Sequence, residues 1–198
     1  SRVAAIPGHI QVLASLFGEY PYLDTKYGIA EGSFSGGMEH PTITLVGATL
    51  LGNATRDLTS LLVHELSHMW WGDEVTMRSW DDIWLNEGFA TYAEVLYFER
   101  ASGLAPGALL SSRYDDGLYA GQLGPRVVAP AADPFRSSGA IYEKGGWVLH
   151  MLRRVVGDET FFAALREYRR RHERGSATRA ELRAVFEELS GRDLKQFF

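Results

Sequence analysis

The sequence predicts an α+β fold in which a few strands precede a mainly helical part. Residues 27–34 are rich in β-forming residues and glycine, and residues 42–46 alternate Thr with Ile and Leu, which is typical of strands. From residue 55 onward, apolar residues recur with the spacing of amphipathic helices. A short group of strands followed by many helices is the order that characterises the α+β class.

The expected elements follow in chain order, and glycine marks the end of most helices. Helices are expected at residues 10–17, 55–71, 82–101, 106–118, 140–156, 159–172, 179–189 and 193–198. Residues 36–40, between the two strands, are predicted to form a glycine-rich turn, and residues 121–134, with three prolines, a loop. No internal repeat or low-complexity linker divides the chain, so its 198 residues suit one large domain or two small ones.

Composition narrows the possible partners. Twenty Lys and Arg against 25 Asp and Glu give a net charge of −5. The basic residues of 166–174 stand among glutamates, so we expect a solvated helix face and no nucleic-acid partner. The chain has no cysteine, so a bound metal would need His, Asp or Glu ligands. No apolar run is long enough to cross a bilayer and no signal peptide is visible, which leaves the compartment of a parent protein open.

One segment carries the clearest chemical signal. His64 and His68, with Glu65 directly after the first, lie within the predicted helix 55–71. Residues four apart lie on one face of a helix, so the two imidazoles can bind one metal ion together. Glu65 can then reach a metal-bound water as the general base. On this segment alone, two ordinary helical histidines remain the alternative.

A third ligand is expected from another element, because a catalytic zinc typically has three protein ligands and one open position. Eighteen residues separate His68 from Glu87, which lies early in the predicted helix 82–101. An antiparallel return of that helix would place Glu87 beside the histidines. Glu94 follows on the same helical face and is a candidate acceptor for the N–H of a ligand histidine. The alternative for Glu94 is an exposed helix glutamate.

The other histidines and the tryptophans carry less information. His9, His150 and His172 are expected to be structural or exposed. The tryptophans are expected to pack around the two long helices, with substrate contact by one of them as the alternative: Trp70, Trp71, Trp80 and Trp84.

Four segments, in this order, resemble the aminopeptidase N family of zinc metallopeptidases. They are Gly-Gly-Met-Glu-His at 36–40, His-Glu-Leu-Ser-His at 64–68, Asn-Glu-Gly-Phe-Ala at 86–90 and Tyr-Glu-Lys-Gly at 142–145. The first departs from the family's pattern, because His40 stands where the family usually has Asn. The resemblance extends to residues 191–194 and covers nearly the whole chain. It implies a thermolysin-like zincin catalytic domain at 1–198, with a small sheet lobe followed by a mainly helical lobe and one zinc ion between them.

The resemblance also implies roles in catalysis. His64, His68 and Glu87 would be the zinc ligands, and Glu65 the general base. Tyr142 would be the family's catalytic tyrosine, because a phenol stays protonated near neutral pH and can donate a hydrogen bond to an oxyanion. Without the family, a half-buried helix tyrosine is the alternative for Tyr142.

A second set of roles concerns the substrate. By the resemblance, Glu39 would bind the free α-amino group of a peptide, a charge that the interior of a chain lacks. Gly36 and Gly37 would let the substrate backbone approach closely, with Met38 beside them. His40 adjoins Glu39 and is larger than the usual Asn, so we expect it to alter the substrate site and its specificity.

The function implied by the resemblance is a zinc-dependent aminopeptidase that releases N-terminal residues by attack of a metal-activated water. A non-catalytic scaffold and a hydrolase that opens a lipid epoxide at the same zinc, as a relative does, are the alternatives. Family members carry a β-rich domain before this region and usually a helical one after it. We therefore expect an excised domain, with flanking domains as partners and with exposed apolar surface that favours self-association.

Overall fold

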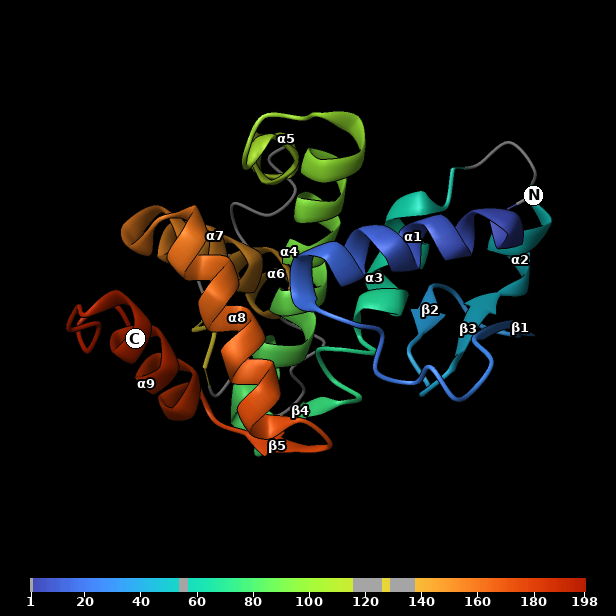
Figure 1. Cartoon of the computed structure of the whole chain (residues 1–198). Coiled ribbons are helices and arrows are strands. Elements are labelled where there is room, and N and C mark those ends of the chain that lie inside the picture. Colours follow the sequence, from blue (N-terminus) through green and yellow to red (C-terminus); the bar gives the residue numbers. More distant parts are fainter. Residues whose placement is uncertain (1, 54–56, 116–125, 129–137) are drawn as a thin grey trace.

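The computed structural model describes residues 2–53, 57–115, 126–128 and 138–198 (Figure 1). Its first part contains α1 (Arg2–Phe17), β1 (Gly28–Gly32), β2 (Gly37–Met38), β3 (Ile43–Gly47), α2 (Ala48–Gly52) and α3 (Thr59–Ser67). The remainder contains β4 (Val75–Met77), the 3-10 helix η1 (Trp80–Asp82), α4 (Trp84–Ser102), α5 (Ala108–Asp115), α6 (Ser138–Ile141), α7 (Glu143–Val156), α8 (Asp158–His172), β5 (Gly175–Ala177) and α9 (Arg179–Ser190). The order of these elements confirms the predicted α+β class.

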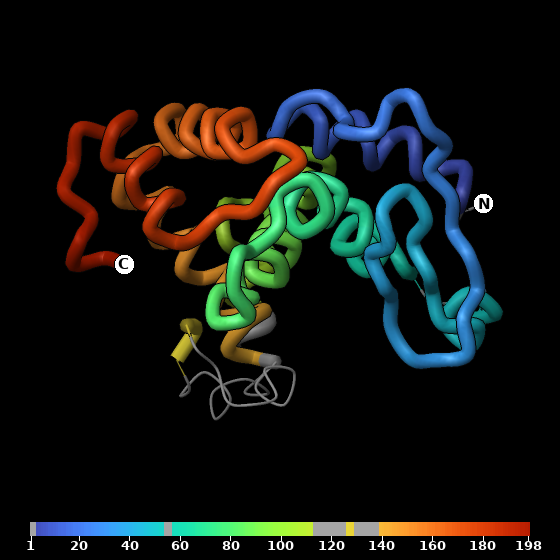
Figure 2. Tube along the Cα trace, turned by 90° about the horizontal axis from the view of Figure 1, so that it is seen from below, coloured from blue at the N-terminus to red at the C-terminus, as the bar shows by residue number. Residues whose placement is uncertain are grey.

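The two parts of the fold lie at opposite ends of the molecule. The sheet of β1, β2 and β3 lies at the end that holds the N-terminus, and α7, α8 and α9 lie at the end that holds the C-terminus (Figures 1 and 2). Helices α3 and α4 lie between them, and α4 packs against both α3 and α7. The small sheet lobe and the helical lobe therefore meet at these two helices.

The sheet is mixed and has the strand order β1-β3-β2. Strand β1 runs parallel to β3, and β2 runs antiparallel to it, with Met38 opposite Leu45. Strand β2 is at an edge of the sheet and packs against α3. The predicted turn at 36–40 therefore contains a short strand, and this strand lies next to the helix that carries the paired histidines.

Helix α4 is the centre of the helical part. All of its residues from Trp84 to Tyr97 are buried, because other elements cover it on every side. The helix ends at Gly103, whose left-handed backbone (φ +67°) closes the last turn, as the sequence predicts. The largest fully buried side chains of the core include Trp70, Trp71, Tyr92, Phe161, Tyr168 and Phe186.

Helix α3 is shorter than predicted. The backbone N–H of Thr59 donates to Asp57 at its start, and residues 54–56 lie outside the described part of the chain. The helix ends at Ser67, and His68 caps it with helical dihedral angles (φ −60°, ψ −23°). A tight turn follows, in which the N–H of Asp73 donates to the carbonyl of His68. The four-residue spacing of the histidines is kept although the helix stops between them.

Three further predicted helices differ from the structure. The helix expected at 10–17 begins at Arg2 and contains Pro7. The helix expected at 140–156 is broken at Tyr142 (φ −85°, ψ −80°), which separates α6 from α7. Residues 193–198 form turns and no helix, because α9 ends at Gly191 (φ +66°) and Leu194 is buried in the core. The predicted loop at 121–134 lies outside the described residues except for 126–128. In the part of the chain that the structure describes, no helix is both long and apolar enough to span a membrane.

The sequence also does not predict the parallel pair of strands β4 and β5. Val75 lies opposite Gly175, a hundred residues away, and the pair has only three residues in each strand. This pairing joins the segment that follows α3 to the connection between α8 and α9.

Candidate metal centre and active site

A cavity of about 620 Å³ opens where the sheet lobe meets the helices. Helix α3 contributes His64 and Glu65, and His68 follows at its C-terminal end. Glu87 comes from the first turn of α4, and Tyr142 from the break before α7. These five residues, which come from three separate segments of the sequence, line one cavity.

The two histidines and Glu87 have the geometry of a metal site. Their ligand atoms all lie within 4.8 Å of one another, and the Oε2 atom of Glu87 is 3.4 Å from the Nε2 atom of each ring. Zinc bonds of about 2.1 Å in a tetrahedral arrangement separate neighbouring ligands by roughly 3.4 Å. The observed spacing therefore fits a zinc ion held by His64, His68 and Glu87.

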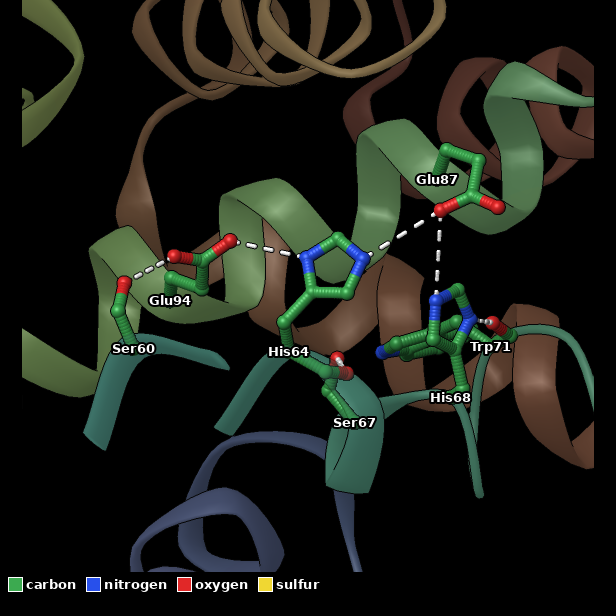
Figure 3. Close-up of polar contacts among 7 residues, drawn as sticks. All are labelled: Ser60, His64, Ser67, His68, Trp71, Glu87 and Glu94. Carbon is green, nitrogen blue, oxygen red and sulfur yellow. Dashed lines mark hydrogen bonds and ion pairs between the residues drawn. The ribbon is translucent and has the colours of Figure 1, made fainter. Parts of the chain in front are cut away.

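Both imidazole rings are oriented by a partner on the far nitrogen (Figure 3). The Nδ1 atom of His64 lies 2.9 Å from Glu94 Oε1, and that of His68 lies 2.9 Å from the carbonyl oxygen of Trp71. A carbonyl oxygen can only accept, so Nδ1 of His68 carries a hydrogen, and in the neutral ring Nε2 then offers its lone pair to a metal. Such partners fix the tautomer that binds a metal.

Electrostatics also favour a cation at this position. Burial opposes protonation of His64, but its hydrogen bonds to Glu87 and Glu94 outweigh burial and hold its pKa well above the usual value. Burial likewise opposes protonation of His68, and the charge of Glu87 nevertheless raises its pKa to about 9. The two rings lower the pKa of Glu87 despite its burial. The buried carboxylates thus attract positive charge to the place where the Nε2 atoms converge.

Glu65 lies on the sheet side of this cluster. A β-carbon added to Gly37 would lie 2.3 Å from Glu65 Oε1, so a side chain at this position would force the carboxylate away from its place beside β2. The carboxylates of Glu65 and Glu39 and the ring of His68 bring their ligand atoms within 4.8 Å of one another. Burial raises the pKa of Glu65 to about 6, a value suited to a group that accepts and returns a proton near neutral pH.

Tyr142 lies against the ring of His64 and lines the same cavity. Its ring stacks on that of His64, with centroids 5.7 Å apart and planes at 24°. Burial, together with the charges of Glu87 and Glu39, raises the pKa of its phenol. The phenol therefore keeps its proton and can donate a hydrogen bond into the cavity.

The structure gathers most of the residues that the sequence singled out. Gly36, Gly37, Met38 and Glu39 all line the cavity. His40 is exposed and is absent from the described residues that line it, so its effect on a substrate stays a prediction.

Glu94 lies where the helical spacing placed it, buried beside His64, and it is not an exposed helix glutamate. It is buried and contacts His64 through one oxygen and Ser60 through the other. Among the tryptophans, Trp70, Trp71 and Trp84 are buried in the core. Trp80 was expected to pack there too, but it is 63% exposed because it lies in η1, outside both helices, where it lines the cavity.

Two contributors to the site were not foreseen from the sequence. Ser60 donates to Glu94 and stands four residues before His64, so helical spacing could have identified it. The carbonyl of Trp71 orients His68, and no sequence pattern signals a backbone acceptor of this kind.

Fold and site together are those of a zinc metallopeptidase. A family model described as the peptidase family M1 domain matches residues 8–119 and 128–198. The chain therefore belongs to peptidase family M1. It is 37% identical, over 150 residues, to aminopeptidase N of Streptomyces lividans, an alignment that covers 68% of this chain.

Solved structures with the same fold agree with this assignment. The M1 zinc metallopeptidase of Deinococcus radiodurans is 30% identical and superposes on 97% of this chain with a TM-score of 0.80. Leukotriene A4 hydrolase of Saccharomyces cerevisiae is 25% identical, with a TM-score of 0.80 over 97% of the chain. The thermolysin-like α+β architecture expected from the resemblance is thus confirmed.

These relatives are much longer than this chain. The aligned region is 17% of the Streptomyces lividans protein and 42% of the Deinococcus radiodurans structure. The activity and partners of the whole protein are therefore treated as proposals below.

Proposed function

We propose that this chain is the catalytic part of a zinc-dependent aminopeptidase that removes residues from the N-terminus of peptides. One observation carries the proposal: the ligand atoms of His64, His68 and Glu87 converge in the same cavity as Glu65 and Glu39. The names of its relatives, aminopeptidase N and M1 zinc metallopeptidase, support it.

A zinc ion held by these ligands would lower the pKa of a bound water and polarise a carbonyl group. Glu65 accepts a proton from the attacking water and passes it to the departing amine. Tyr142 donates a hydrogen bond to the oxygen that becomes negative as the carbonyl turns tetrahedral. Both side chains line the cavity, and the raised pKa values of Glu65 and Tyr142 are compatible with these roles.

Glu39 sets the position of the cut. Its carboxylate is close to that of Glu65, so the pair presents negative charge to the cavity that both residues line. A protonated α-amino group is the complementary charge, and only the first residue of a peptide carries it. The adjoining edge strand β2 is free on one side among the described strands and can pair with an extended substrate.

A second candidate acts at the same site. The likeness to leukotriene A4 hydrolase favours a hydrolase that opens a lipid epoxide, because the shared fold could present the same zinc to a different electrophile. The scaffold alternative is weaker, because the ligand atoms and their orienting partners are all in place.

Substrate selectivity tests the proposal. The zinc-loaded protein is assayed with a panel of aminoacyl fluorogenic amides, each with a free and with an acetylated amino group. We expect hydrolysis of the free forms and almost none of the acetylated ones, and Glu39→Gln should reduce this preference. Equal rates on both forms would indicate an endopeptidase, and turnover of a lipid epoxide alone would favour the second candidate.

A further inference from the structure

The N-terminal parts of α4 and α7 touch with no side chain between them. A β-carbon added to Gly88 would lie 2.8 Å from the Cα atom of Gly145, and one added to Gly145 would lie 2.8 Å from the Cα atom of Gly88. Real β-carbons essentially never approach another atom so closely. Because the obstructing atoms are backbone, a change of rotamer could not relieve the overlap.

This contact lies between two groups of the site. Gly88 directly follows Glu87 on α4, and Gly145 lies three residues after Tyr142, in the first turn of α7. The carbonyl of Tyr142 accepts a hydrogen bond of 2.8 Å from the N–H of Gly146. The start of α7 and the backbone of Tyr142 must therefore move together.

We propose that Gly145 is a positioning residue for Tyr142. Its missing side chain lets α7 lie against α4 closely enough to hold the phenol over the His64 ring, beside Glu87. The inference rests on the role proposed for Tyr142 above. The inference goes beyond that role, because it states that a contact between the backbones of α4 and α7 determines where the phenol lies.

The size of the effect follows from the geometry. In Gly145→Ala, the helices must separate by roughly 0.6 Å before the 2.8 Å approach reaches the 3.4 Å of an ordinary contact. A misplacement of about 1 Å in a reacting group can cost roughly 100-fold in rate. We expect kcat to fall by about 10- to 100-fold, with KM nearly unchanged, because the phenol acts on the transition state.

Gly146→Ala is the matched control. It adds the same methyl group one residue further along α7 and gains the same helix propensity. The three atoms nearest to its β-carbon would all be side-chain atoms of Leu110 and Thr91, none nearer than 3.3 Å, and side chains can shift slightly. We expect this variant to keep zinc, thermal stability and kcat close to those of the unmodified protein.

A double-mutant cycle separates positioning of Tyr142 from a general structural effect. If Gly145 acts through Tyr142, Gly145→Ala should lower kcat when Tyr142 is present and change it little in the Tyr142→Phe background. Equal losses in both backgrounds, or a wild-type kcat for Gly145→Ala, would overturn the inference. Failure of the proposed function looks different, because the unmodified zinc-loaded protein would then not hydrolyse aminoacyl amides.

Crystal structures of the zinc-loaded variants provide a readout independent of turnover. The phenol of Tyr142 should shift away from Glu87 in Gly145→Ala and stay in place in Gly146→Ala. An unshifted phenol in Gly145→Ala would refute the inference whatever the activity. If Gly145→Ala does not fold, Gly88→Ala opens the same contact from α4, and the same shift is expected.

Discussion

At the scale of single residues, the site depends on which ring nitrogen of each histidine already has a hydrogen-bond partner. Glu94 and the carbonyl of Trp71 occupy the Nδ1 atoms of His64 and His68, so both Nε2 atoms face Glu87. Glu65 is close enough to serve this centre but is absent from the cluster of three ligands that includes Glu87. We therefore propose that binding of the metal and transfer of the proton belong to different carboxylates, Glu87 and Glu65.

This division predicts different losses in two variants. Glu65→Gln should keep zinc and lose nearly all turnover, because an amide cannot accept the proton. Glu87→Ala should weaken zinc binding itself, because it removes a ligand. Metal analysis after dialysis and rates on an aminoacyl amide measure the two properties. Equal loss of zinc from both variants would contradict the assignment.

The orienting role of Glu94 predicts an effect on affinity for the metal. Glu94→Ala should weaken zinc binding by roughly 10- to 100-fold, the range typical of residues that hold a metal-binding histidine. Ser60→Ala removes only the hydroxyl that donates to Glu94, so we expect a smaller change. Competition with a chelator gives both dissociation constants. Unchanged affinity in Glu94→Ala would show that His64 needs no partner.

At the scale of elements, a buried arginine joins the helices behind the site. Arg153 of α7 donates to Glu99 of α4 at 2.7 Å and to both carboxylate oxygens of Asp158 at the start of α8, at 3.0 and 2.7 Å. It also lies 3.3 Å from the hydroxyl of Tyr92 on α4. This one side chain therefore holds together three helices, of which α4 and α7 also carry site residues.

Removal of this arginine should destabilise the fold. In Arg153→Ala, the mostly buried carboxylate of Glu99 loses its positively charged partner. Breaking a buried ion pair in this way typically costs about 3–5 kcal/mol of stability. Arg154→Ala, at the exposed neighbouring position, is the control and should change stability little. Urea unfolding of the two variants measures the difference. Similar midpoints would show that packing alone holds the helices.

The same contact predicts a dependence on pH. Hydrogen bonds from Arg153 lower the pKa of Asp158 below its usual 3.8. The unfolded chain therefore binds this proton more readily, so the stabilisation is complete above that value and is lost as pH falls through the folded pKa. Urea midpoints measured between pH 5 and pH 2 should fall less steeply in Arg153→Ala than in the unmodified protein. Parallel curves would contradict this linkage.

At the scale of the whole molecule, the cavity lies where two lobes meet, and the relatives contain much more chain than is present here. We propose that residues 1–198 form a catalytic domain that works beside further domains. Several apolar side chains on or near the sheet are exposed, among them Phe34, Met38 and Ile43, and they offer a surface for such neighbours or for self-association. The absence of a nucleic-acid partner remains a prediction.

Comparison of this chain with a longer version of the protein tests that proposal. We expect equal zinc binding but much slower hydrolysis by residues 1–198, because substrate positioning contributes several kcal/mol that the zinc ligands alone do not supply. Sedimentation of the short chain should show self-association. A monomer with the rate of the longer protein would show that these residues suffice.

The sequence by itself determined the local features of this protein. The four-residue spacing of His64 and His68 places both on one face of a helix. A catalytic zinc needs a third protein ligand, and this requirement identifies Glu87 as the candidate. The fold class followed from the order of periodic segments. Such features depend on neighbouring residues and on the chemistry of side chains, both of which can be read along the chain.

Only the tertiary structure decided how distant segments meet. Two features join distant parts of the chain: the parallel pair β4–β5 and the backbone contact of Gly88 with Gly145. Two others depend on how such parts pack: the exposure of Trp80 and the break at Tyr142. No local periodicity encodes them, because a close approach between helices is set by the sum of all side chains around them. The chain specifies the reacting groups, and the packing of α3, α4 and α7 sets the distances between them.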